Sequence, residues 1–201
     1  MLRDPPPRSQ YKEMIATKIT AYFEKKLRVA AVQNSCMRYL NVAALSLRGR
    51  HHPALSNLIT THDVRLSKPH LKFLTGNYLT YSVRAAQSGG SPACRLCLSG
   101  SEETTSHVIS TCLALTEERK KLFEEYRKLC MQTRGCLNFD NFLENEEITC
   151  QFILDPTSLN LSERISPNDP ILNNFFKLSR DFCYLLDKTR LKMLKEKEAR
   201  M

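Results

Sequence analysis

Apolar residues recur at three- and four-residue steps along much of the chain, which is the spacing that one face of an α-helix requires. The first such run starts at about Tyr11 and continues at Ile15, Ile19, Tyr22, Phe23 and Leu27. The next strong run covers residues 115–129, where alternating charges occupy the opposite side, and its apolar positions are Leu115, Leu122, Phe123, Tyr126 and Leu129. The last is one long helix near the C-terminal end, with a stripe of Ile171, Phe175, Leu178, Phe182, Leu185 and Leu186. The pattern predicts a mainly α protein.

Breaks in this pattern divide the chain. Ser67 is expected to cap a helix with Pro69 in its first turn and an inner face of Leu71, Leu74, Tyr78 and Leu79. The clearest interruption is "QSGGSPA" over residues 87–93. We therefore expect four parts: a disordered lead-in over 1–10, a basic helical segment over 11–87, a cysteine-rich knuckle with an amphipathic helix over 92–135, and an acidic linker with the C-terminal helix over 140–201.

Positive charge gathers in the first part of the chain. The formal net charge is +9. Residues 1–90 hold fourteen Lys/Arg and four Asp/Glu, a balance of 14 − 4 = +10, whereas residues 91–201 hold sixteen and seventeen, a balance of 16 − 17 = −1. A polyanionic partner would therefore meet the first part. The alternative is that these cations only keep the helices soluble.

The sequence contains no apolar run of the roughly 18 residues that a membrane span needs, and its first residues have no secretory signal pattern. We therefore expect an intracellular protein, nuclear or cytoplasmic, in a reducing compartment. Disulfides are rare there, and clustered cysteines indicate metal binding.

Three of the eight cysteines and one histidine lie in the stretch "CRLCLSGSEETTSHVISTC". The spacing Cys94-x2-Cys97-x9-His107-x4-Cys112 supplies four nitrogen and sulfur ligands, the number that a structural zinc site requires. Residues five apart on a regular helix lie about 140° apart. The chain must therefore leave the regular helix between His107 and Cys112 if both bind one Zn²⁺. Cys130 and Cys136 are the substitutes if one of the four is not a ligand.

Other uses of these cysteines fit the sequence less well. A redox Cys-x-x-Cys pair needs a strand before it, and "SGGSPA" is not a strand. A zinc deaminase needs an upstream His-x-Glu, which the chain lacks. Nothing indicates an organised Cys–His pair of the cysteine-protease kind.

Several segments, in order from about residue 18 to 195, resemble the C-terminal region of non-LTR retrotransposon polyproteins, which follows the reverse transcriptase domain. They are "YFEKKLRVAAVQNSCMRYLNVAALSL", "HLKFLTGNYLT", the knuckle with its acidic-Thr pair before His107 and an arginine in the helix after Cys112, "QFILDPTSLN" and "FFKLSRDFCYLLDKTRLKML". The family's proline after the last cysteine is Leu113 here. The polymerase motif Tyr/Phe-x-Asp-Asp and the nuclease motifs are missing, so the resemblance implies a non-catalytic fragment.

The resemblance also implies that the knuckle region helps to hold RNA or DNA. The knuckle loop is acidic and lacks aromatic residues for base stacking, so we read its Zn²⁺ as structural and assign nucleic-acid contacts to basic residues. These candidates are Arg28, Arg38, Arg48, Arg50, Arg65, Lys68, Lys72, Arg84 and Arg95. The alternative is a protein-interaction module, in which zinc joins two helical parts and apolar faces meet a protein partner. We expect neither a membrane nor a small-molecule substrate.

Overall fold

The computed structural model describes residues 7–33, 37–41, 52–55, 58, 60–133, 137–159 and 170–200. Within these ranges the protein is mainly helical and has no strand, and the only extended pairing is an isolated antiparallel bridge between Ala93 and Glu102. The predicted fold class is therefore confirmed. No helix in the described ranges is both long and apolar enough to cross a membrane.

The described part of the chain contains the following helical elements, in chain order. They are α1 (Arg8–Gln33), η3 (Pro53–Leu55), α2 (Thr61–Leu74), α3 (Tyr81–Ser88), η4 (His107–Thr111), η5 (Leu113–Leu115), α4 (Thr116–Met131), α5 (Asp140–Leu143), α6 (Glu146–Leu154), η6 (Pro156–Ser158) and α7 (Pro170–Glu198). Two of the predicted long helices, over residues 115–129 and from Ile171 onward, correspond to α4 and α7.

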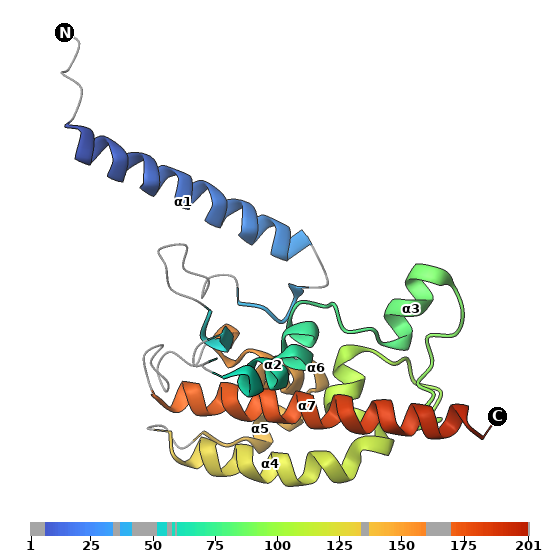
Figure 1. Ribbon diagram of the computed structural model, residues 1–201. Helices are drawn as coiled ribbons and strands as arrows, with labels where there is room; N and C mark the ends of the chain where they lie inside the picture. The colour runs from blue at the N-terminus through green and yellow to red at the C-terminus, as the bar shows by residue number, and fades with distance from the viewer. Residues whose placement is uncertain are drawn as a thin grey trace.

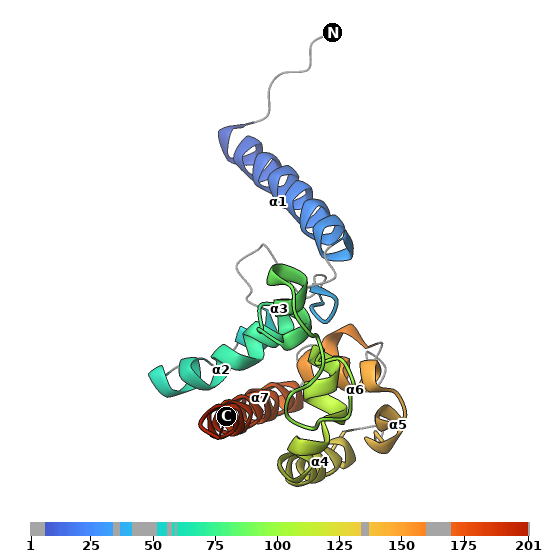
Figure 2. The same cartoon turned by 90° about the vertical axis from the view of Figure 1, so that its right-hand side faces the viewer.

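Helix α7 is the element against which the others pack. Helix α4 runs antiparallel along it, α2 lies along another side of it (Figures 1 and 2), and α6 also contacts it. The predicted apolar stripe of α7 lies on the side that packs against these helices, and its Phe175, Phe182 and Leu186 are fully buried. Buried apolar residues of this 29-residue helix extend to Leu186 and pack in the core, and Arg190 and Lys197 beyond them contact the cysteine-rich segment.

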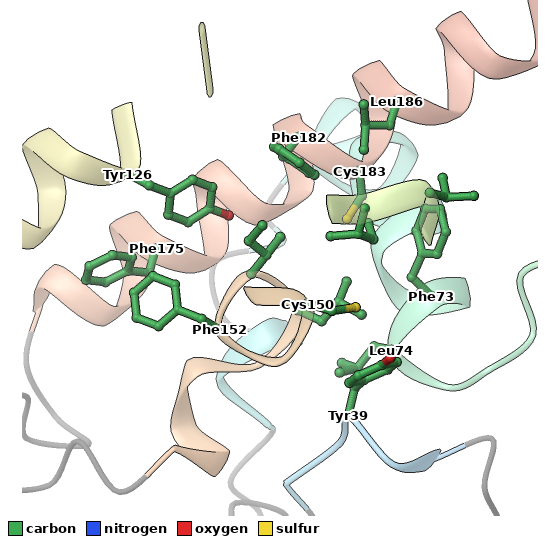
Figure 3. Close-up of a cluster of buried hydrophobic side chains, with 14 of the residues drawn as sticks. Tyr39, Phe73, Leu74, Tyr126, Cys150, Phe152, Phe175, Phe182, Cys183 and Leu186 are labelled. Carbon is green, nitrogen blue, oxygen red and sulfur yellow. The ribbon is translucent and has the colours of Figure 1, made fainter. Parts of the chain in front are cut away.

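The centre of the core is aromatic. Tyr126 of α4, Phe152 of α6 and Phe175 of α7 meet there (Figure 3), with ring centroids 5.4 to 6.4 Å apart. The Tyr126 hydroxyl is buried but lies 3.0 Å from Ser179 Oγ, so its polar atom is satisfied. Three helices that are distant in sequence are therefore held by one cluster of rings.

The predicted start of α2 at Ser67 is wrong. The helix starts at Thr61, and Thr60 is its N-cap, because the Thr60 hydroxyl accepts from the Asp63 N–H while Asp63 accepts from the Thr60 N–H. This capping box satisfies two backbone amides at the helix start. Pro69 consequently lies inside the helix, and Leu79, predicted to face inward, is half exposed.

The acidic segment over residues 140–154 was predicted to be a linker, and this is wrong. It contains α6, whose Phe152, Ile153 and Leu154 are fully buried. Its acidic residues include Glu146 and Glu147 in the first turn, where they complement the helix dipole, and Asn145 caps the same end. The acidity marks the start of a core helix.

Helix α1 begins at Arg8, inside the predicted lead-in, and extends away from the other helices in both views (Figures 1 and 2). Five of the apolar residues that predicted it are exposed: Tyr11, Ile15, Ile19, Tyr22 and Phe23. Ile19, Tyr22 and Phe23 are each more than half exposed.

Replacing Phe152 by Ala should lower the free energy of unfolding by about 3–5 kcal/mol, because it removes a ring from a packed aromatic cluster. Urea unfolding followed by circular dichroism measures this loss. Ile148→Ala on the same helix is the control, since Ile148 is 42% exposed and its truncation should change stability by less than about 0.5 kcal/mol. Equal effects of the two substitutions would contradict the packing described for α6.

Candidate metal centre

The two cysteines of the Cys-x-x-Cys pair lie in a tight turn closed by a short extended pairing. The Cys94 N–H donates to the Ser101 carbonyl at 2.8 Å, and the Glu103 N–H donates to the Pro92 carbonyl at 2.8 Å. Leu98 and Gly100 have positive φ angles of 55° and 78°, which reverse the chain within a few residues. The turn therefore holds Cys94 and Cys97 on one side.

The second pair of ligands lies on a wide helical turn. Residues His107–Thr111 form a π-type turn, and the Cys112 N–H donates to the His107 carbonyl five residues back, at 2.7 Å. This turn brings Cys112 back over His107, which a regular helix would not do. The expected departure from a regular helix between these two residues is confirmed.

Together the two turns bring the four predicted ligands to one point. One ligand atom each from Cys94, Cys97, His107 and Cys112 lies within 4.8 Å of the other three. The Sγ atoms of Cys94 and Cys112 are 3.8 Å apart, and Cys97 Sγ lies 3.5 Å from His107 Nε2. Cys94, His107 and Cys112 are buried and Cys97 is partly exposed. The cluster can hold a metal ion.

The His107 ring is oriented by its neighbours. Its Nε2 faces the cluster, and its Nδ1 lies 3.2 Å from Thr111 Oγ1, so a proton on Nδ1 has an acceptor. The His107 backbone N–H donates to Thr104 Oγ1 at 3.0 Å. In metal-binding histidines, a hydrogen bond from the ring nitrogen that does not face the metal fixes the ring, and here Nδ1 with Thr111 Oγ1 can form that bond.

The thiols of the cluster differ in acidity. Burial raises the pKa of Cys112 to about 12 and also raises the pKa of Cys94. At Cys97 burial acts in the same direction, but hydrogen bonds from Ser99, Cys94 and His107 outweigh it and lower the pKa to about 6. Cys97 therefore loses its proton at a lower pH than Cys94 and Cys112, and a metal ion that binds must displace the protons of these two buried thiols.

A buried ion pair ties the knuckle to α7. Glu103 is fully buried, and its Oε1 accepts from Arg190 Nη2 of α7 and, at 3.1 Å, from the Tyr81 N–H at the start of α3. Its Oε2 lies 3.6 Å from Cys94 Sγ. One carboxylate thus joins the metal cluster, α3 and α7.

A second tether comes from the C-terminal end of α7. Lys197 Nζ donates to the carbonyls of Arg95 and Leu96, at 2.6 and 3.0 Å. These carbonyls belong to the turn between Cys94 and Cys97. The turn is therefore held to α7 from outside the cluster as well.

Arg119 of α4 lies on the other side of the cluster. Its Nη2 donates to the Cys112 carbonyl at 2.6 Å and lies 3.3 Å from Thr116 Oγ1. Burial lowers the pKa of Arg119, and the negative charges of Cys112, Glu118 and Cys97 act in the opposite direction.

The predicted nucleic-acid residues fall into separate groups. Arg65, Lys68 and Lys72 are exposed on α2 at spacings of three and four residues, so they share one face. Arg65 and Lys68 also line a shallow groove with Thr60, Thr61 and Val64. In the described ranges none of the three cations forms an ion pair.

The other predicted cations lie elsewhere. Arg84 and Arg95 are exposed and stack on the Tyr81 ring, with 5.6 and 4.7 Å from guanidinium carbon to ring centroid. Arg38 forms an ion pair with Glu147 at 3.3 Å. Arg48, Arg50 and the side chain of Arg28 lie outside the described part of the chain. The assignment of these residues to nucleic acid stays a prediction.

The remaining described cysteines are core residues. Cys130, Cys150 and Cys183 are fully buried, and none belongs to the ligand cluster. Cys130 is therefore not needed as a substitute ligand, and Cys36 and Cys136 lie outside the described residues.

No protein-family model matches the chain, and searches of curated proteins and of solved structures also found no match. The resemblance to retrotransposon polyproteins therefore depends on the sequence motifs themselves.

The sequence did not identify Arg190 and Lys197 as residues that support the cluster, and it did not indicate that Glu103 links Arg190 to Cys94. The acidic-Thr pair before His107 was a signal for Glu103 and Thr104. No local signal identifies Arg190, because its partner lies 87 residues away in the sequence.

Replacing Glu103 by Gln should lower the free energy of unfolding by about 3 kcal/mol, because it leaves the buried Arg190 guanidinium without its counter-charge. Glu102→Gln is the matched control, since Glu102 is exposed and its carboxylate accepts from the Ser82 hydroxyl at an exposed site and forms no ion pair among the described residues. Urea unfolding of both metal-loaded variants gives the comparison. If E103Q were as stable as E102Q, Glu103 would not anchor the knuckle on α7.

Proposed function

We propose that this protein is a non-catalytic helical module stabilised by one Zn²⁺, held by Cys94, Cys97, His107 and Cys112. The observation that carries the proposal is the convergence of these four ligand atoms within 4.8 Å. Two separate turns contribute two ligands each, and both have the local geometry that convergence requires. A chance grouping of thiols would need neither the π-type turn nor the oriented histidine.

The donor set favours zinc. Thiolates with an imidazole are the ligands of structural zinc, whereas oxygen-seeking ions such as Mg²⁺ and Ca²⁺ prefer carboxylates. In a tetrahedral zinc site, sulfurs are about 3.8 Å apart and sulfur and nitrogen about 3.5 Å apart. The distances of 3.8 Å between Cys94 and Cys112 and 3.5 Å between Cys97 and His107 agree with these values.

A structural role fits this ligand set better than a catalytic one. Four protein ligands leave no open position for water or substrate. The chain also lacks the polymerase, nuclease and deaminase motifs. Among the described residues, the buried pair of His52 and Asp155 does not offer a free base, because His52 Nδ1 accepts from the Ala54 N–H while its Nε2 lies 3.1 Å from Asp155.

We further propose that the chain corresponds to the C-terminal region of a non-LTR retrotransposon polyprotein. The motif residues of that resemblance have physical roles at the cluster. Glu103 connects Cys94 to Arg190, Thr104 accepts from the His107 backbone, and Arg119 holds the Cys112 carbonyl. These roles support a shared knuckle architecture.

The module is proposed to assist nucleic-acid binding through the exposed face of α2. Arg65, Lys68 and Lys72 support this, because three unpaired cations on one face can each meet a phosphate. Such contacts position a nucleic acid without reading its sequence, so RNA and DNA are both candidates.

A protein partner is the second candidate. Helix α1 supports it, because Ile19, Tyr22 and Phe23 are exposed on a helix that stands away from the core. Exposed apolar side chains gathered on one element are typical of interaction sites. In this case the zinc would only stabilise the module.

The purified protein should contain one zinc ion per chain, and Cys94→Ser with Cys97→Ser should abolish stoichiometric binding. A structural zinc ion contributes about 10–16 kcal/mol to small zinc-binding peptides at neutral pH, so this variant should lose the knuckle structure. Elemental analysis and native mass spectrometry give the stoichiometry.

Cys130→Ala is the control for this experiment, because it also removes a buried thiol but one outside the cluster. It should keep one zinc per chain. Stoichiometric zinc that survives the double cysteine substitution would refute the ligand assignment.

Replacing Arg65, Lys68 and Lys72 by Gln should weaken binding to RNA or duplex DNA of any sequence. Each lost phosphate contact should reduce the slope of log affinity against log salt by about 0.9 on duplex DNA. Fluorescence anisotropy at several salt concentrations measures both quantities.

Its matched control changes Lys120, Lys121 and Lys128 of α4 to Gln, which removes the same charge from exposed positions. The control should leave most of the binding and its salt slope intact. Equal losses in both variants would contradict a contact on α2. No binding at low salt by the zinc-loaded wild type would favour the protein partner.

A further inference from the structure

We propose that Arg119 completes the metal centre as its positioning residue, by balancing the charge of the metal–thiolate cluster and donating a hydrogen bond to it. The inference rests on the proposed zinc site. It concerns a residue of α4, outside the two turns that supply the ligands.

The first observation is an unused donor in a buried position. Arg119 is only 6% exposed, and its Nη1 is buried without a hydrogen-bond partner. Its Nη2 is already engaged with the Cys112 carbonyl and with Thr116 Oγ1. A buried guanidinium donor without an acceptor destabilises the folded protein. Nη1 therefore needs an acceptor, and binding of a metal would create one by deprotonating the cysteines.

The second observation is charge. In the described ranges Arg119 has no ion pair, and its hydrogen-bond acceptors are two neutral oxygens. A buried cation without a nearby counter-charge is strongly destabilising. Three cysteine thiolates, one neutral imidazole and one divalent ion carry a net charge of −1, because metal-bound cysteines are deprotonated. This charge is equal and opposite to that of Arg119.

The third observation is the position of the guanidinium. The bond of 2.6 Å from Nη2 to the Cys112 carbonyl fixes the guanidinium beside a ligand residue. Cys112 is itself fully buried, so water does not screen this neighbourhood. A cysteine thiolate of the cluster is therefore the acceptor for the Arg119 Nη1 donor.

The Cys112 carbonyl bond alone does not account for this residue. A single neutral donor would satisfy that carbonyl, whereas Arg119 brings a full charge and a second planar donor group into the interior. Charge balance and thiolate donation use both properties. The arrangement explains why an arginine occupies this buried position of a charge-rich helix.

The test compares zinc affinity and Co²⁺ spectra of full-length wild type, Arg119→Met and Arg119→Lys. Arg119→Met should weaken zinc binding, measured by competition with a chelator, by about 10- to 100-fold, as loss of an outer hydrogen bond to a metal ligand does. Arg119→Lys keeps the charge and the side-chain stem, so it should fold normally and lose less affinity.

The Co²⁺ complexes give a readout that a purely structural role would not move. A hydrogen bond to sulfur makes a thiolate a weaker electron donor, so its loss should shift the sulfur-to-cobalt charge-transfer band to lower energy in Arg119→Met, and by less in Arg119→Lys, which keeps an N–H donor. Lys120→Met is the control, because it removes one positive charge from the next position at an exposed site. It should change neither the affinity nor the band.

The outcomes separate this inference from the zinc proposal. If wild type binds no zinc, the zinc site itself fails. If wild type binds zinc and the Arg119 variants match it in affinity and in the Co²⁺ band, the zinc site stands and the role of Arg119 is overturned. A loss of affinity in Arg119→Met that Lys120→Met reproduces would also overturn it, since only net charge would then matter.

Discussion

The wide turn between His107 and Cys112 is the constraint on which the site depends. A regular helix would point these two side chains in different directions, and an extended segment would separate them. The hydrogen bond from the Cys112 N–H to the His107 carbonyl, five residues back, removes this conflict. An irregular turn of this kind gives up regular backbone hydrogen bonding. It is stabilised here by Thr104 at its start and by Arg119 at the carbonyl of its last residue.

The cluster is joined to the helical core on several sides. Glu103 connects it to Arg190 of α7, Lys197 holds the turn after Cys94, and Arg119 reaches it from α4. Helices α4 and α7 also share the aromatic core around Tyr126 (Figure 3). The knuckle and the core are consequently parts of one packed unit, so removing an ion bound at the cluster should weaken the contacts between the knuckle and α7.

Much of this arrangement could be predicted from the sequence, and the failures have physical reasons. Helices α4 and α7 are long enough to show the helical period, and the spacing of Cys94, Cys97, His107 and Cys112 predicts that these four residues come together. Helix α6 has nine residues and its last three residues are all buried, so its apolar run "FIL" shows no helical period, and its acidic first turn resembled a linker. At α2 the Ser67–Pro69 signal competed with the true capping box at Thr60 and Asp63. Contacts such as that of Glu103 with Arg190 depend on tertiary packing, which no local pattern encodes.

The most direct test of the account is X-ray absorption spectroscopy at the zinc edge of the purified protein. Binding by the three cysteines and one histidine of the cluster gives a first shell of three sulfurs at about 2.3 Å and one nitrogen at about 2.0–2.1 Å. A shell of four sulfurs, or one with oxygen ligands, would contradict the assignment of Cys94, Cys97, His107 and Cys112 as the zinc ligands.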